Sequence, residues 1–247
     1  MARKSKIVDE VVKPKPYFSV PERFDFITQF VKLLAGGRIN SFILTGDAGL
    51  GKSYTVTESL KQKGLVEDTI GEVGDYVVVK GYSTPKSLFR LLFEYNGKVI
   101  VFDDCDQVFK DPIGANILKA ALDSSEKRII SWGAEFPESE PLPNRFEFIG
   151  RVVFISNLNQ QQFPQALLSR SMKVDLTLST QEKIERIHQV MDSLKVEVEE
   201  KTEVMEFIQE HAESASELSI RSALGILKLK RDIGEGWKRL ALYNFVN

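Results

Sequence analysis

A glycine-rich turn has the residue types of a phosphate-binding loop. The segment GDAGLGKS, residues 46–53, fits the pattern G-x-x-x-x-G-K-[ST] without a mismatch, between an apolar run at 41–45 and a helical pattern at 52–63. Glycines let backbone N–H groups surround phosphate oxygens, and the following helix adds its positive N-terminal dipole. Lys52 is expected to reach the β- and γ-phosphates, and the Ser53 hydroxyl to ligate Mg²⁺. The predicted nucleotide contacts are Gly46, Asp47, Ala48, Gly49, Leu50, Gly51, Lys52, Ser53 and Tyr54.

Two adjacent carboxylates follow a second apolar run, at 99–102. In phosphate-loop enzymes an acid at such a strand end holds Mg²⁺, usually through water, and we assign this role to Asp103. Asp104 is placed to polarise the attacking water. Acids also end strands for purely structural reasons, but a complete phosphate loop upstream favours the chemical interpretation. Cys105 is expected to be a small packed residue, since no histidine is near it in the sequence.

The elements that must position these residues alternate between strand and helix. A wholly apolar strand is typical of a parallel strand buried on both faces, so the chain is predicted to be α/β, with helices on both faces of a parallel sheet. The expected strands are 41–45, 75–80, 99–102 and 151–156, and the expected helices are 22–35, 52–63, 84–95 and 113–122.

Two regions break this alternation. Residues 124–150 contain two short strand patterns, at 128–132 and 145–148, around a proline-rich tip, which predicts an inserted β-hairpin. After position 178 only helical patterns follow, beginning with a capping box at Ser179 and Glu182. The predicted division is an N-terminal arm or linker at 1–20, an α/β domain at 21–178 and a small all-α domain at 179–247.

Composition limits the classes of protein. The 247 residues carry a net charge of −2, so nucleic-acid binding would need a local basic patch. The one cysteine excludes an intramolecular disulfide. No apolar run approaches the roughly 20 residues of a membrane span, and the basic N-terminus lacks the apolar core of a signal peptide. We expect a soluble cytoplasmic protein without membrane contact.

After residue 20 the chain resembles the AAA+ ATPases. The resemblance implies that residues 21–178 are a parallel-sheet ATPase domain and residues 179–247 its helical lid. It also implies ATP and Mg²⁺ as ligands and closure into a homo-oligomeric ring, commonly a hexamer. Within VVFISN, Asn157 resembles the first sensor, which orients water against the γ-phosphate. Within LLSRS, Arg170 resembles the arginine finger that reaches a neighbouring subunit's site. Within LSIR, Arg221 resembles the second sensor in the lid.

Each of these three residues also has an ordinary structural interpretation. Asn157 could cap a turn, Arg170 could form a surface ion pair of little energy, and Arg221 could project from an amphipathic helix. Arg151 and Arg145 are the alternative finger candidates.

One residue departs from the family pattern, because most members have glutamate where this chain has Asp104. Aspartate is one methylene shorter, so the water must sit closer or the strand must shift. We expect an active ATPase of reduced rate, or a nucleotide switch if Asp104 cannot reach the water.

The substrate is left open by the sequence. Lys80, Gly81 and Tyr82 form a candidate pore loop that would suit an extended polypeptide or a nucleic-acid strand, and an ordinary strand-to-helix loop fits equally well. The hairpin position resembles branches that act on DNA and branches that unfold proteins. Its basic residues, Lys127, Arg128 and Arg145, are balanced by acids.

The runs FDDCD, ALDSSEKRIISW and SRSMKVDLTLS also resemble phage-encoded AAA+ proteins, which implies a host-cytoplasmic location and a role in DNA replication. Three functions follow. The first is a ring ATPase that remodels or translocates nucleic acid or a replication complex. The second is a remodeller or unfoldase of a protein partner, and the third is a slow or non-hydrolysing nucleotide-dependent scaffold.

Overall fold

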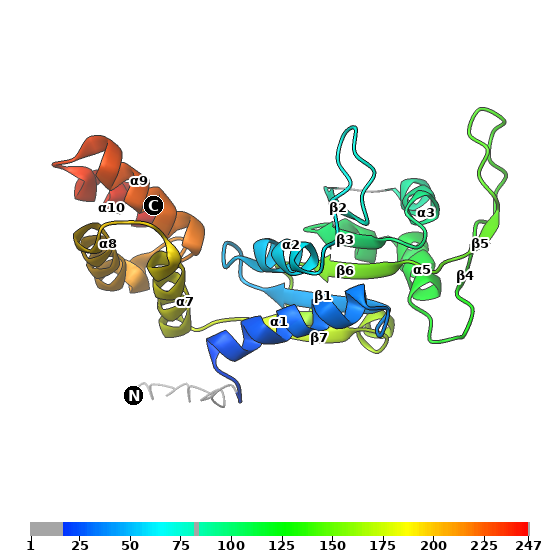
Figure 1. Cartoon of the computed structure of the whole chain (residues 1–247), viewed down its shortest axis with the longest axis horizontal. Helices are drawn as coiled ribbons and strands as arrows, with labels where there is room; N and C mark the ends of the chain where they lie inside the picture. The colour runs from blue at the N-terminus through cyan, green and yellow to red at the C-terminus, as the bar shows by residue number, and fades with distance from the viewer. Residues whose placement is uncertain (1–16, 82–83, 247) are drawn as a thin grey trace, which may run out of the picture.

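The computed structural model describes residues 17–81 and 84–246. Residues 1–16 of the expected N-terminal arm and Tyr82 of the expected pore loop lie outside these ranges. Figure 1 shows a central sheet flanked by helices, with a group of helices at one end and a β-hairpin at the other.

The strands are β1 (Ser41–Gly46), β2 (Tyr76–Lys80), β3 (Val99–Asp103), β4 (Ile129–Ser131), β5 (Arg145–Glu147), β6 (Arg151–Ile155) and β7 (Met172–Leu176). The helices are α1 (Val20–Ala35), α2 (Lys52–Gln62), α3 (Pro85–Glu94), α4 (Gln107–Lys110), α5 (Pro112–Ala121), α6 (Gln165–Leu168), α7 (Thr180–Ser193), α8 (Val198–His211), α9 (Ile220–Ile233) and α10 (Trp237–Val246). Two short 3-10 helices are η1 (Gln160–Gln162) and η2 (Ala212–Ser214).

The central sheet has five strands in the order β2-β3-β6-β1-β7, and every neighbouring pair is parallel. β1 and β3 are buried along their whole length, as expected of apolar strands covered on both faces. The predicted α/β class with a parallel sheet is confirmed.

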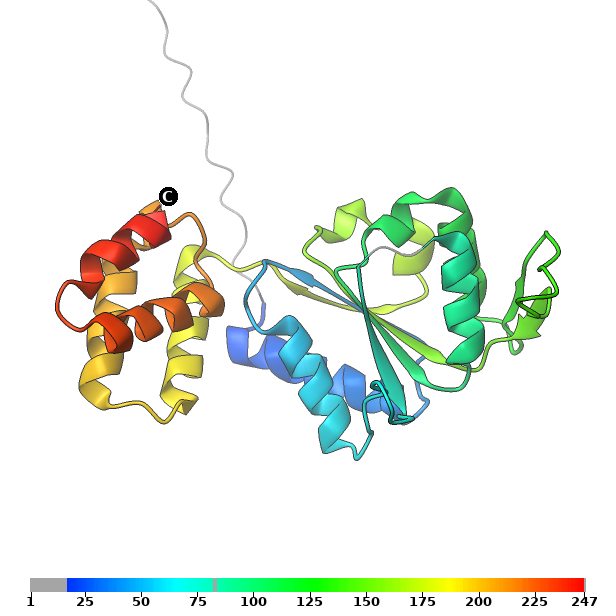
Figure 2. The same ribbon diagram turned by 90° about the horizontal axis from the view of Figure 1, so that it is seen from above.

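Helices cover both faces of this sheet (Figure 2). Side chains of alternate strand residues point to opposite faces, which divides the core in two. Leu44, Val101 and Val153 pack with α1 and α2. Phe102 and Phe154 pack with α3, α4 and α5, and their rings stack with centroids 5.4 Å apart.

The first helix begins earlier than the apolar pattern predicts, at Val20 instead of Glu22. Ser19 caps it and forms a capping box with Glu22, and Pro21 lies in the first turn. Proline is tolerated there because a first-turn N–H has no intrahelical partner. Pro21 is therefore part of a helix start.

The edge strand β7 and the short helices α4 and α6 were not predicted from the sequence. β7 lies at the edge of the described sheet, where it pairs with β1. Along it the exposed side chains of Lys173 and Asp175 alternate with the buried ones of Val174 and Leu176. This half-buried alternation is typical of a sheet edge and carries no continuous apolar run. α4 and α6 have four residues each, too few for helical periodicity to show.

The predicted hairpin is present, with β4 and β5 antiparallel and Ile130 opposite Phe146. It lies against α3 through an aromatic cluster. The ring of Phe89 contacts those of Trp132, Phe136 and Phe146 at centroid distances of 5.7, 5.5 and 5.2 Å. The hairpin is thus fixed to the domain at its base.

Arg128 at the root of the hairpin is buried. Its Nη1 donates to the carbonyl of Ala121 at the end of α5, and its Nη2 donates to the carbonyl of Gly150 just before β6, each at 2.9 Å. Its guanidinium also lies 5.1 Å from the Phe148 ring centroid. Arg128 is therefore a structural clamp and not part of a basic surface for nucleic acid.

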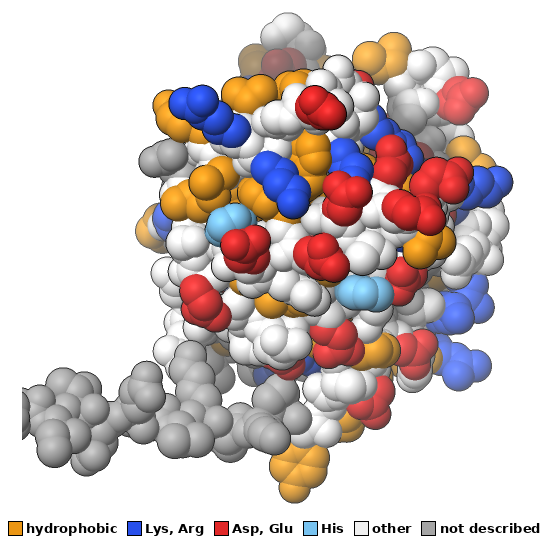
Figure 3. Space-filling model, turned by 90° about the vertical axis from the view of Figure 1, so that its left-hand side faces the viewer, with side chains coloured by type: hydrophobic (Ala, Val, Ile, Leu, Met, Phe, Trp, Pro, Cys, Tyr) orange, Lys and Arg blue, Asp and Glu red, His pale blue; other side chains and the backbone are white. Residues whose placement is uncertain are grey.

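Helices α7 to α10 form a separate helical region, called the lid below, with its own core around Ile187, Phe207, Ile226 and Trp237. The predicted capping box of Ser179 and Glu182 begins it. Acidic and basic side chains lie side by side on its outer end (Figure 3). Within the described ranges, no helix is long and apolar enough to cross a membrane.

Candidate functional site

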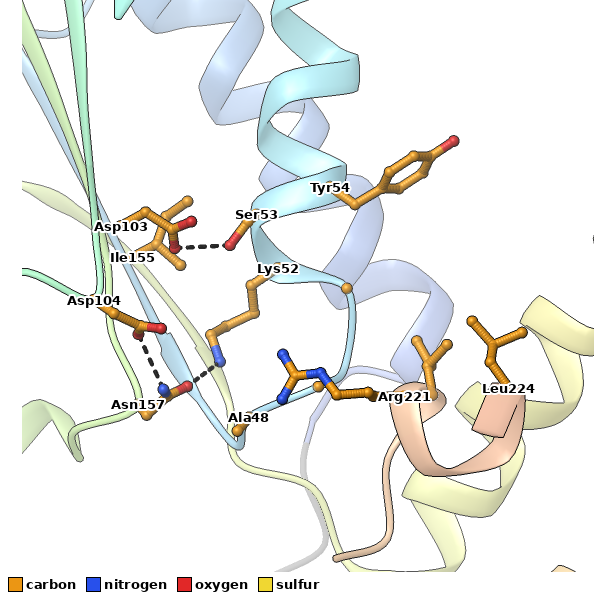
Figure 4. A pocket seen from close by; sticks show the side chains of 13 residues that line it. Ala48, Lys52, Ser53, Tyr54, Asp103, Asp104, Ile155, Asn157, Arg221 and Leu224 are labelled. Atoms are coloured by element: carbon orange, nitrogen blue, oxygen red, sulfur yellow. Dashed lines mark hydrogen bonds between the residues drawn. The ribbon is translucent and has the colours of Figure 1, made fainter. Parts of the chain in front are cut away.

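The carboxyl ends of β1, β3 and β6 meet at one edge of the sheet, and the predicted site residues gather there. β1 runs into the glycine-rich loop, which enters α2 at Lys52, while β3 ends at Asp103 and β6 leads to Asn157. Figure 4 shows these side chains converging on one pocket. Its volume is about 400 Å³, within the range of small-molecule sites.

Lys52 is buried and its ammonium group is held at three points. Nζ donates to the carbonyls of Gly46 and Asp47 at 2.8 and 2.7 Å, and to Oδ1 of Asn157 at 2.7 Å. Burial lowers the pKa of Lys52, although nearby carboxylates, chiefly Asp104, counteract the effect. The loop thus holds the ammonium group in a fixed position at the strand ends.

Ser53 and Asp103 form a second polar pair. Ser53 Oγ donates to Asp103 Oδ1 at 2.7 Å, and the other carboxylate oxygen of Asp103 lies 3.6 Å from Lys80 Nζ. A hydroxyl and a carboxylate side by side are hard oxygen donors of the kind that Mg²⁺ takes, together with substrate phosphates and water. The pair therefore fits the predicted metal position.

Asp104 directs its carboxylate to the same place by an unusual backbone conformation. Its φ of 56° is positive, which among the described non-glycine residues occurs here alone. Aspartate tolerates this region better than most residues, and such conformations concentrate at functional sites. Asn157 Nδ2 donates to Asp104 Oδ1 at 2.9 Å, so the Asn157 amide bridges Asp104 and Lys52.

The Asp104 carboxyl is suited to accept a proton. It stays accessible from the pocket, yet partial burial raises its pKa, and the negative charge of Asp103 raises it further. A raised pKa makes a carboxylate a stronger base, provided that it remains ionised at the working pH.

The lid closes one side of the pocket at the start of α9. Ile220 N donates to the carbonyl of Gly49 at 2.9 Å. Gly49 has φ of 69°, and a Cβ there would lie only 2.6 Å from Cβ of the buried Ser219. Glycine is required here by both conformation and space. Arg221, Ile220 and Leu224 of α9 line the pocket, and the Arg221 side chain extends toward the loop (Figure 4).

Not every predicted loop residue lines the pocket. Ala48, Gly49, Gly51, Lys52, Ser53 and Tyr54 do, whereas Gly46, Asp47 and Leu50 do not. The side chain of Leu50 is wholly buried in the core below α1, and Asp47 pairs with Lys183 of α7 at 3.0 Å. Tyr54 projects away from Lys52 and is largely exposed.

Arg170 is not brought to this pocket. It lies just before β7, at the opposite end of the sheet, where Nε is 3.5 Å from Asp123 Oδ1 and Nη1 donates to the carbonyl of Ala166 at 2.8 Å. The alternative finger candidates also lie elsewhere: Arg151 starts β6 beside Gly37, and Arg145 starts β5 in the hairpin. A contribution of any of them to this pocket would have to come from another copy of the chain.

Lys80 and Gly81 of the expected pore loop are exposed at the end of β2, and Tyr82 lies outside the described residues. The contact of Lys80 with Asp103 connects this loop to the predicted metal position.

Some residues at this edge had no role in the sequence analysis. Asp106 accepts from Ser156 Oγ at 2.6 Å and thereby ties the end of β6 to the segment after β3. Ile155, Ile220 and Leu224 add apolar walls, which only the pairing of distant segments could reveal. Cys105 is buried with Sγ directed at the Val79 carbonyl, and burial raises its pKa to about 11, so the expected packing role is supported.

Comparisons with known proteins bear on the fold of the chain. No protein-family model matches the chain. An uncharacterized 36.7 kDa protein of Enterobacteria phage T4, in the nrdC-mobD intergenic region, is 28% identical over 243 residues, which is 90% of this chain and 73% of that protein.

Among solved structures, domain III of the Thermotoga maritima replication initiation protein DnaA aligns with a TM-score of 0.52 and 15% identity, covering 93% of this chain and 95% of that one. A chain of the HORMA:CdnC:Trip13 complex of E. coli MS115-1 aligns with a TM-score of 0.41 and 14% identity, and the alignment covers 84% of this chain and 87% of that one. The second likeness is too low to carry an argument. DnaA domain III is an AAA+ ATPase domain, and with its parallel five-stranded sheet and small C-terminal helical region this chain has the AAA+ α/β fold.

Proposed function

We propose that the chain binds Mg-ATP in the pocket at the carboxyl ends of β1, β3 and β6 and hydrolyses it. The observation that carries this proposal is the Asn157 amide, which joins the ammonium group of Lys52 to the carboxylate of Asp104. The three groups needed to neutralise a phosphate, orient a water and accept its proton are thereby connected in one network.

Each residue has a distinct task in this proposal. The loop amides and Lys52 bind the phosphates, and Ser53 and Asp103 hold Mg²⁺, which neutralises developing charge on the phosphoryl group. Asp104 accepts the proton of the attacking water. Asn157 fixes the direction of the Asp104 carboxylate, and Arg221 brings a cation from the lid to the γ-phosphate.

The short Asp104 side chain is compatible with hydrolysis at a reduced rate. The left-handed backbone at this residue sets the direction of the carboxylate, and the Asn157 hydrogen bond holds it in the pocket. The nucleotide switch remains the alternative if the carboxylate is too far from the water.

We further propose that several copies form a ring, with the hexamer as the expected state, in which Arg170 of one subunit reaches the pocket of the next. The position of Arg170 at the opposite end of the sheet supports this arrangement, since within one chain it cannot serve the pocket.

We propose nucleic acid or a replication-type nucleoprotein complex as the target of the ATPase. Two comparisons support this: the relative is a phage protein, and the neighbour in fold is a replication initiation protein.

A protein partner is the second candidate, because one observation weakens nucleic-acid binding near the pore loop. Lys86 and Arg90 of α3 both pair with Glu140 of the hairpin, at 2.7 and 2.6 Å. Glu140 thereby offsets one of these two positive charges within the chain. Lys230 and Arg231 in the lid each pair with an acid of their own, Glu203 and Glu200.

Steady-state phosphate release by the purified chain tests the proposal. We expect turnover that needs Mg²⁺ and rises with single-stranded or duplex DNA. Stimulation by unfolded protein instead would support the second candidate, and nucleotide-dependent assembly without turnover would support a scaffold. Imaging with a slowly hydrolysed ATP analogue would show the subunit number and the place of Arg170. If Lys52→Ala binds nucleotide as well as the unaltered chain, the pocket is not the site.

A further inference from the structure

A second arginine of the lid lies beside the phosphate loop. Arg186 projects from α7, and a Cβ on Gly51 would lie 3.7 Å from its Nη2 and 3.5 Å from Cδ1 of Ile220. Gly51 and Ile220 both line the pocket. The absence of a side chain at Gly51, whose φ is 89°, leaves the loop backbone open to this guanidinium.

The Arg186 guanidinium is held from behind by an aromatic ring. Its Cζ lies 3.6 Å from the centroid of Phe24 in α1, which is itself buried. A guanidinium stacked on a ring keeps its edge N–H groups free for planar acceptors. The position of the group is therefore fixed while its donors remain available.

No carboxylate neutralises Arg186 among the residues that the structure describes. Its one side-chain acceptor is Gln189 Oε1, at 3.4 Å from Nη1, and its buried Nε has no partner. Burial lowers the pKa of Arg186 without an opposing acid. A half-buried cation without an anion is unfavourable, and the aromatic ring offsets only part of the free-energy cost of its burial.

Two neighbouring cations do have acidic partners, so the lack of one at Arg186 is not general in this region. Arg23 of α1 pairs with Glu182 and also donates to the Thr177 carbonyl. Lys183, one turn before Arg186 on the same helix, pairs with Asp47. The cation beside Gly51 alone lacks an acidic partner in this group of three.

We propose that Arg186 is a further nucleotide-binding residue, whose guanidinium binds the α- and β-phosphates from the side of Gly51. This inference rests on the proposed nucleotide site. Lys52 Nζ lies toward Gly46 and Asn157, where the γ-phosphate is expected, whereas Gly51 precedes the helix start that faces the α- and β-phosphates. A planar cation and a phosphate form two parallel charge-assisted hydrogen bonds.

The test compares Mg-ADP and Mg-ATP binding to the full chain by titration calorimetry. We expect Arg186→Met to weaken both nucleotides by the same factor, about tenfold to 100-fold, and Arg186→Lys to weaken them less. Arg221→Ala should weaken ATP more than ADP, since its expected contact is the γ-phosphate. The matched control is Arg231→Met, which removes a lid guanidinium outside the pocket.

Thermal unfolding without nucleotide separates this role from packing. Because Arg186→Met removes a half-buried charge without an acidic partner and keeps the apolar stem, the Tm should stay unchanged or rise. Unchanged affinities with a lowered Tm would make Arg186 a packing residue, and a loss confined to ATP would place it at the γ-phosphate; either result overturns the inference. If the unaltered chain binds neither nucleotide, the proposed function fails first and the inference with it.

Discussion

The two ends of the parallel sheet differ in how completely they are built. At the carboxyl end, Lys52, Asn157 and Asp104 are joined by hydrogen bonds and backed by the lid. At the opposite end, Arg170 has one weak ion pair and one backbone acceptor, and it is about one-third exposed. One end of the sheet thus holds a connected polar network, and the other holds a cation with few partners. Under the proposed function, the first would bind phosphate within one chain and the second would serve another copy.

The largest expected effect on turnover comes from removing Arg170 at the end of the sheet opposite the pocket. Arg170→Ala should lower turnover by about 10³- to 10⁵-fold, because an arginine finger stabilises transition-state charge, while Mg-ATP binding is retained. Phosphate release and equilibrium binding on the same preparation measure the two quantities. Equal turnover in the variant would remove Arg170 from the mechanism.

Mixing two inactive variants sharpens the comparison. An Arg170→Ala subunit keeps an intact pocket, and an Asp104→Asn subunit keeps Arg170. Where the second subunit presents Arg170 to the pocket of the first, the interface contains a complete site. Equimolar mixing should therefore restore part of the activity. A mixture as inactive as its components would show that the finger does not act between subunits.

At the carboxyl end of the sheet, replacing the proposed general base, Asp104, should have the next largest effect. Asp104→Asn should lower turnover by about 10²- to 10⁴-fold, the range of general base catalysis, with nucleotide affinity preserved. The amide keeps the size of the carboxylate but cannot accept the proton. Lost affinity instead of lost turnover would make Asp104 a binding residue.

The raised pKa of Asp104 predicts an acid limb in the pH profile. Only the ionised carboxylate accepts a proton, so kcat should fall by about tenfold per pH unit below this pKa. Because the folded pKa is raised, the limb should lie at higher pH than an ordinary aspartate gives. Initial rates across a pH series measure it, and a limb at or below the ordinary value contradicts the assignment.

The smallest expected effect is at the partner of the finger. Asp123→Asn removes the ion pair with Arg170, and solvent screening leaves exposed pairs of this kind with little energy. Turnover should change by no more than about fivefold in either direction. A loss as large as that of Arg170→Ala would mean that Asp123 positions the finger.

The carboxyl end of the sheet was predictable from sequence because its signals are local. The loop at 46–53 and the acids after 99–102 each follow an apolar strand, and parallel strands bring their carboxyl ends to one edge. The strand order, and therefore the meeting of Asn157 with both Lys52 and Asp104, depends on pairing between distant segments. Only the family resemblance indicated Asn157.

The remaining features depend on tertiary context. β7 carries no continuous apolar run, because it is half-buried at the sheet edge. Arg186 is one of several charged residues on an amphipathic helix, and its distinction is the lack of an acid partner in space. Arg128 was grouped with the basic residues of the hairpin, because its burial between α5 and β6 cannot be read from the sequence.

The Arg128 clamp also has a mechanical consequence. It ties the root of the hairpin to the last turn of α5 and to Gly150, the residue before β6. The five residues of β6 extend over about 17 Å, and the strand ends two residues before Asn157. A displacement of the hairpin root would therefore be passed along β6 to Asn157, whose amide contacts Asp104. Under the proposed function, this would link the hairpin to the position of the attacking water.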